Sequence, residues 1–172
     1  MFHTRCRVLR SAAISVGAPA AVVLLLACVS SLPDPLANLS DTHPNPSLSP
    51  LEVVQIQMEA FRNNDRTDRG IEIAFRFASP SNRSATGPLV RFVGMIKQGG
   101  YASMLEAVEV VYGVVEERGD RAQVPVTVFT ADGSAWGYRF HLRRQSGNEY
   151  EHCWMTEAVQ AVPMAIPAER TT

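Results

Sequence analysis

The spacing of the apolar residues changes near Val108, and this change restricts the fold more than any other feature of the sequence. Before it, apolar residues recur at helical spacing, whereas after it β-branched and aromatic residues dominate. The later part contains four strand-like runs, separated by "RGDR", "DGS" and "SGNEY", which are typical of hairpin connections: residues 108–117, 122–131, 135–145 and 151–162. Helices followed by sequential strands predict an α+β fold, with N-terminal helices packed on a curved antiparallel four-stranded sheet.

The first predicted helix begins at a capping box. In "SPLE", the Ser49 hydroxyl and the Glu52 carboxylate can each bond a free backbone N–H, and Pro50 suits the first helical position. Gln57 lies in the middle of an apolar helix face, so it is the polar side chain that we most expect to be buried. The residues of that face are Leu51, Val54, Met58 and Phe61.

Two more helices are predicted before the sheet. Residues 70–79 fit both a helical and a strand period, and the Ser79-Pro80 pair that follows favours a helix ending there. A polar connector is then expected as far as Gly87-Pro88, where the third helix opens and continues to "KQGGY". Pro125, in the second strand-like run, predicts a bulge or an edge position because proline lacks an N–H.

Residues 1–31 have the order of a secretory signal: a basic start, an apolar run and then small residues. Within them "LLAC", Leu25 to Cys28, resembles a bacterial lipobox, in which the cysteine thiol receives the lipid. The leader therefore predicts an exported, extracytoplasmic protein that is lipidated at Cys28 and anchored to the membrane. A plain signal peptide, an uncleaved anchor and an organelle transit peptide, which would give a plastid or thylakoid location, are the alternatives.

Composition defines the rest of the chain. Residues 32–48 hold four prolines and predict an extended, mobile linker, followed by one domain at residues 49–165 and a frayed tail at 166–172. Of the 16 basic residues, Arg5, Arg7 and Arg10 lie in the leader, whereas all 17 acidic residues follow it, so residues 34–172 carry a net charge of −4. We expect no nucleic-acid binding, because no basic stripe is present.

Motifs for known chemistry are missing. There is no G-x-S-x-G elbow and no Gly-rich phosphate loop. His141 and His152, with Glu149 and Glu151, could form a metal site on a hairpin, but alternation of polar residues at strand ends explains them better, so we predict no metal and no cofactor. Four residues are candidates for a buried acid or base by position alone: Glu72, Glu106, His141 and Glu157.

Four segments together resemble an uncharacterised family, domain of unknown function 4864. They are "VVQIQMEAFRNND", "GIEIAFRFASPSNRSATGPLVRF", "GGYASMLEA" and "HCWMTEAV", and the resemblance covers roughly Leu48 to Val162. The family implies no activity and no site residues, because none are assigned. More loosely, the order of elements is similar to the cystatin-like or nuclear-transport-factor-2-like cone, which implies a cavity but does not identify what fills it.

The residues that we expect to contact a ligand in such a cavity combine aromatic rings with two polar groups. Arg83 is the one charged group of the expected connector, and alternation along "AWGYRFHL" places Trp136 on a sheet face that the helices should cover. The predicted ligand-binding residues are Gln57, Phe75, Arg83, Trp136 and Trp154.

A presumed aromatic cavity without a catalytic constellation favours a non-enzymatic binding module. We expect it to bind a small apolar ligand or a protein partner at the cell envelope or in a thylakoid-type compartment. One alternative is a cavity enzyme of isomerase or hydrolase type that uses a single buried acid–base residue. The other is an assembly factor or scaffold for a membrane complex, which would form a homodimer through its sheet.

Overall fold

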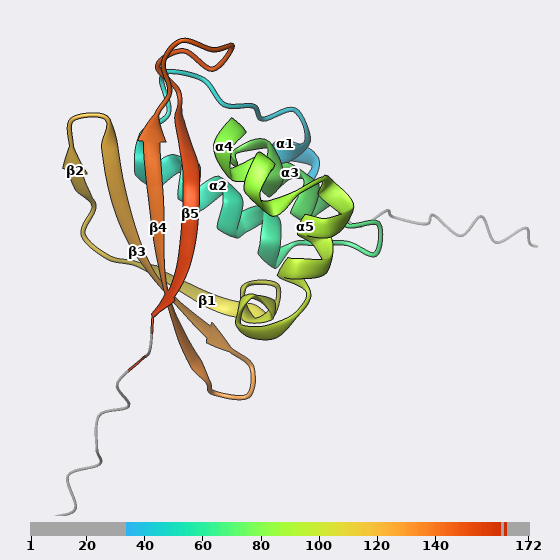
Figure 1. Cartoon of the computed structure of the whole chain (residues 1–172). Helices are drawn as coiled ribbons and strands as arrows, with labels where there is room; N and C mark the ends of the chain where they lie inside the picture. Colours follow the sequence, from blue (N-terminus) through green and yellow to red (C-terminus); the bar gives the residue numbers. More distant parts are fainter. Residues whose placement is uncertain (1–33, 163, 165–172) are drawn as a thin grey trace, which may run out of the picture. The chain divides into compact units, whose positions relative to one another are not determined.

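The computed structural model describes residues 34–162 and 164 of the chain, so the leader with Cys28 and the tail at 166–172 lie outside it. The helical elements come first and the strands follow, and Figure 1 shows the helices gathered on one side of the sheet. The predicted α+β architecture is confirmed. None of the described helices is long and apolar enough to cross a membrane. The helical elements are α1 (Ala37–Ser40), α2 (Pro50–Arg62), α3 (Arg69–Arg76), α4 (Pro80–Thr86), α5 (Leu89–Ile96) and the 3₁₀ helix η1 (Gly99–Met104).

All strands pair antiparallel, in the order β1-β3-β4-β5, and β2 pairs with the other half of β3. Pro125 lies in β3, which is internal, at the interruption between β1 and β2. Its carbonyl accepts a hydrogen bond from the Gly113 N–H at 2.8 Å, so this side of Pro125 faces the interruption, where Pro125 has no partner in β1 or β2 that needs the missing N–H. The strands are β1 (Ala107–Tyr112), β2 (Glu116–Arg118), β3 (Arg121–Thr130), β4 (Ala135–Arg144) and β5 (Trp154–Val162).

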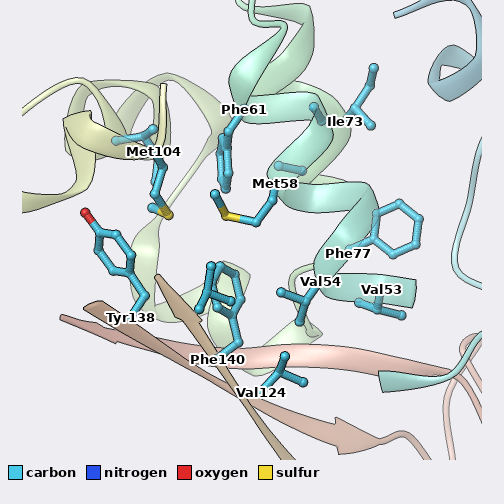
Figure 2. Close-up of a cluster of buried hydrophobic side chains, with 14 of the residues drawn as sticks. Val53, Val54, Met58, Phe61, Ile73, Phe77, Met104, Val124, Tyr138 and Phe140 are labelled. Carbon is cyan, nitrogen blue, oxygen red and sulfur yellow. The ribbon is translucent and has the colours of Figure 1, made fainter. Parts of the chain in front are cut away.

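Helix α2 carries the core. It begins with the predicted capping box, in which the Ser49 side chain accepts from the Glu52 N–H and the Glu52 carboxylate accepts from the Ser49 N–H. Figure 2 shows the buried α2 side chains facing those of the sheet. Helix α3 approaches α2 closely because Gly70 has no Cβ; a Cβ there would lie 2.1 Å from the Ala60 carbonyl oxygen. The facing residues are Val54, Met58 and Phe61 of α2 with Val124 and Phe140 of the sheet.

The segment expected as an extended linker is folded onto the domain from Asp34 onward. Leu36 has no exposed surface, and the short helix α1 follows it. The Asp34 carboxylate lies 2.7 Å from the Arg69 guanidinium, which lowers the pKa of Asp34 chiefly through that hydrogen bond. The expected linker was extended and mobile, whereas burial of the Leu36 side chain holds this Pro-rich segment on the domain.

The prediction of a polar connector after Ser79 is wrong, because residues Pro80–Thr86 form helix α4. The Ser79 hydroxyl accepts a hydrogen bond from the Asn82 N–H at 3.1 Å, and Pro80 occupies the first helical turn. This is the same Ser-Pro signal that begins α2, so the sequence contained the information.

Two of the predicted strands are longer than the strands of the structure. The first run is divided into β1 and β2, and the last strand begins at Trp154 rather than at Glu151. His152 has a φ of 63°, which a regular strand does not permit.

Candidate functional site

A pocket of about 240 Å³ lies where α2, α4, α5 and η1 meet β5. Most of its wall is apolar, and its polar lining residues are Gln57, Asn82, Thr86, Tyr101, Thr156 and Glu157. A pocket with apolar walls and few polar groups is the usual form of a small-molecule site. Its apolar lining residues include Phe61, Ala85, Phe92 and Phe140.

One side of this pocket is built on the buried amide of Gln57. Its Nε2 donates to the Ala74 carbonyl at 2.9 Å, and its Oε1 accepts from the Thr156 hydroxyl at 2.7 Å. Gln57 and Thr156 are 3% and 1% exposed. The amide therefore joins α2 to both α3 and β5. Its nitrogen and its oxygen each have a hydrogen-bond partner, as is usual for buried polar groups.

The backbone of Thr156 extends this connection. Its N–H donates to the Phe77 carbonyl at 2.8 Å, and its carbonyl accepts from the Ser79 N–H at 2.9 Å, which forms a parallel bridge opposite Ala78. The Asn82 side-chain amide donates to the same Thr156 carbonyl at 3.0 Å. The junction between α3 and α4 is thereby fixed to the edge of the sheet.

A β-bulge follows at Glu157. In the pairing of β4 with β5, His141 lies opposite Ala158 and Leu142 lies opposite Thr156, so Glu157 has no partner residue. Its carboxylate accepts hydrogen bonds from the Ser81 hydroxyl and from the Gln145 Nε2, the latter at 3.3 Å. The bulge brings this residue to the pocket lining.

The wall opposite α4 is fixed by tyrosines. The Tyr138 hydroxyl forms short hydrogen bonds with the Ser103 hydroxyl and the Gly100 carbonyl, which hold η1 against β4. Burial raises the pKa of Tyr138, and the hydrogen bond from Ser103 opposes that shift. The Tyr101 ring stacks on Tyr138 at 6.3 Å, and its hydroxyl donates to the Val159 carbonyl at 3.0 Å.

Of the five predicted ligand-binding residues, Gln57 is the one that lines the pocket. Phe75 lies behind the wall, where its ring packs on Phe92 at 4.8 Å. Arg83 places its guanidinium 5.7 Å from the Phe75 ring and 5.3 Å from the Tyr150 ring, and it donates to the Tyr150 hydroxyl at 3.1 Å. Arg83 therefore holds α4 in place rather than facing the cavity.

The two tryptophans lie apart from the pocket. Trp154 is 3% exposed and packs beneath the Arg144 guanidinium at 4.7 Å. Trp136 is 42% exposed, although the alternation of β4 predicted that the helices would cover it. Trp136 lies at the start of β4, next to the turn at residues 131–134, where the helical layer does not cover the strand.

The candidate acids and bases are dispersed. Glu72 is exposed and pairs with Arg76 at 3.7 Å, Glu106 is exposed, and His141 lies half-buried opposite Gln123 on the other face of the sheet. Glu157 alone is part of the pocket. Across residues 34–162, no three His, Cys, Asp or Glu side chains gather as metal ligands would.

Sequence reasoning missed two features that shape the site. Thr156 was part of a run assigned to a strand, and nothing in "WMTEAV" shows that its hydroxyl would meet Gln57. The bulge at Glu157 likewise depends on the pairing with β4. The start of α4 could have been inferred, because Ser79-Pro80 repeats the helix start at Ser49-Pro50.

We predict that Gln57→Leu lowers the free energy of unfolding by about 1–3 kcal/mol, because the buried Thr156 hydroxyl loses its acceptor. Thr156→Val should have a similar cost, because it leaves the Gln57 oxygen without a donor. Chemical denaturation of both single variants and the double variant measures these values.

The double variant is the control for this prediction. Replacing both partners by apolar groups removes the unsatisfied atoms, so the combined loss should be smaller than the sum of the single losses by about 1 kcal/mol. Strict additivity would show that the two side chains do not depend on each other.

Comparison with known proteins places this chain in a family. A search of the curated proteins finds no match. Among solved structures, the chain is similar to a SEC-C motif containing protein from Rhodopseudomonas palustris, at 16% identity and a TM-score of 0.43, over 67% of this chain and 80% of that chain. The model of the family described as "Domain of unknown function (DUF4864)" matches residues 49–168, which is most of the chain. The chain therefore belongs to the DUF4864 family.

Proposed function

We propose that this protein binds a small, mainly apolar ligand in the pocket between α2, α4, α5, η1 and β5, and that it does so without catalysing a reaction. The observation that carries the proposal is the pocket itself, with apolar walls beside the paired amide of Gln57. Polar groups that are already fixed by partners can orient a ligand at little entropic cost.

The size of the pocket supports a compact ligand. A dry cavity of about 150 Å³ accommodates benzene in a well-studied engineered protein. At about 240 Å³, this pocket suits a molecule with a single ring and a short side chain. Such a ligand, with about ten non-hydrogen atoms, would bind with a dissociation constant on the order of 0.1 mM.

The polar groups favour binding over chemistry. The side-chain atoms of Gln57 and Thr156 that meet are neutral and bonded to each other, so neither is an acid or a base. Glu157 accepts hydrogen bonds from Ser81 and Gln145, and no second carboxylate and no imidazole lies beside it among the described lining residues. A general acid or base of the alternative cavity enzyme would instead need a proton-transferring group aimed at the ligand.

We further propose that the protein is exported and held at a membrane through lipid on Cys28, which lies outside the described residues. The support is the order of the leader and the "LLAC" sequence that ends at this cysteine. The binding domain would then act beside a membrane, where small apolar molecules concentrate.

Ala85→Phe tests the binding proposal. Ala85 lines the pocket from the exposed side of α4, so a phenyl ring there would fill the entrance without disturbing the core. We expect the affinity for 3-phenylpropan-1-ol, measured by calorimetry, to fall at least about tenfold, since ten non-hydrogen atoms must compete with the new ring.

Ser84→Phe is the matched control, because Ser84 is exposed on the same helix and does not line the pocket. It should retain the affinity of the unchanged protein. Equal affinity in Ala85→Phe and Ser84→Phe would rule out this pocket as the site.

Cys28→Ser tests the anchor. If Cys28 is lipidated, the variant should move from the membrane fraction to the soluble fraction in its own host, because the thiol that accepts the lipid is lost. Cys6→Ser changes a cysteine of the same leader and should leave the distribution unchanged. Unaltered membrane retention of Cys28→Ser would instead support an uncleaved hydrophobic anchor.

A further inference from the structure

We propose that the ligand of this pocket carries a positive charge, as a primary amine on an apolar, ring-containing body. This inference rests on the proposed function and adds the chemical class of the ligand. It depends on the sign of charge in the pocket: of the described residues that line it, Glu157 alone is charged, and none is Arg, Lys or His.

The Glu157 carboxylate has the capacity to bind a cation. Its two recorded donors, the Ser81 hydroxyl and the Gln145 amide, are both neutral. None of the ion pairs of the described residues includes Glu157. A carboxylate can accept about four hydrogen bonds, so two positions remain for an ammonium group.

The basic residues around Glu157 do not line this pocket. Arg121, His141 and Arg143 share a second pocket with Glu157, on the other face of the sheet, and Arg83 is held away from the lining. Arg83 belongs to α4, as does Ser81, but its guanidinium lies between Phe75 and Tyr150 and donates to the Arg76 carbonyl and the Tyr150 hydroxyl. It is not part of the pocket lining. A ligand with a carboxylate would therefore meet a like charge at Glu157, and no cation of the described lining residues would offset it.

The walls fit the same ligand. Aromatic faces attract ammonium groups, and four aromatic residues line the pocket: Phe61, Phe92, Tyr101 and Phe140. Asn82, which lines the pocket next to Ser81 in the sequence, uses its amide N–H on the Thr156 carbonyl, while its Oδ1 accepts no hydrogen bond from the described residues. That oxygen is a second acceptor for an amine.

Three probes of similar size and the same nine-carbon skeleton test the sign of the charge: 3-phenylpropylamine, 3-phenylpropan-1-ol and 3-phenylpropanoate. They share one apolar body and differ in the head group, so their affinities for the full chain, measured by calorimetry at neutral pH and low salt, isolate the charge. We expect the amine to bind about five- to tenfold tighter than the alcohol, as a partly buried ion pair would give, and the carboxylate to bind most weakly.

Glu157→Gln should abolish the preference and bring the affinities for the amine and the alcohol within about twofold of each other, because the amide keeps the shape and loses the charge. Glu106→Gln removes an exposed carboxylate that does not line the pocket, so it should keep the full preference. Loss of the preference in both variants would indicate a general effect of net charge and overturn the assignment to Glu157.

The remaining outcomes separate this inference from the proposed function. If the alcohol binds and Ala85→Phe blocks it, but the amine binds no tighter, the pocket is a binding site and the amine class is wrong. If the carboxylate binds tightest, the amine class is likewise wrong. If none of the three probes binds, both proposals fail. The comparison of probes needs only the unchanged protein, so it tests the preference for an amine even if Glu157→Gln does not fold.

Discussion

The hydrogen bonds of the Gln57 amide hold together three elements that are far apart in the sequence. Its Nε2 meets the Ala74 carbonyl of α3, and its Oε1 meets the Thr156 hydroxyl of β5, 99 residues away. A buried amide without partners would destabilise the fold, so both neighbours must remain in place. This fixes the distance between the helical layer and the last strand.

The pocket follows from that constraint. Thr156 also binds the backbone on both sides of Ala78, so α4 begins at the sheet edge with Ser79 and leads away from it. The bulge at Glu157 then shifts the register of β5 and brings a carboxylate to the lining. Helix α2 packs onto the sheet over Val124 (Figure 2), whereas the space between α4, α5, η1 and β5 remains open as the pocket.

Local signals in the sequence predicted much of the fold. The capping box at Ser49, the helical face around Gln57 and the hairpin connections gave the α+β order, and the combined segments gave the family. Features that depend on tertiary contacts could not be predicted in this way. Leu36 becomes core only because the domain offers it a place, and Trp136 remains exposed because the helical layer ends before it. In the site, Gln57 was foreseen as a buried polar group, whereas its partner Thr156 and the bulge at Glu157 depend on strand pairing.

Native-state hydrogen exchange of the Ser79 and Thr156 amides tests most directly whether this junction supports the pocket. Both amides take part in the bridge between the start of α4 and β5. If the junction is as rigid as the sheet, they should exchange with the same opening free energy as the amides of Val126 and Phe140, and 3-phenylpropylamine should protect them further. Exchange through local openings that cost about 2 kcal/mol less than those of the sheet, unchanged by the probe, would contradict the account.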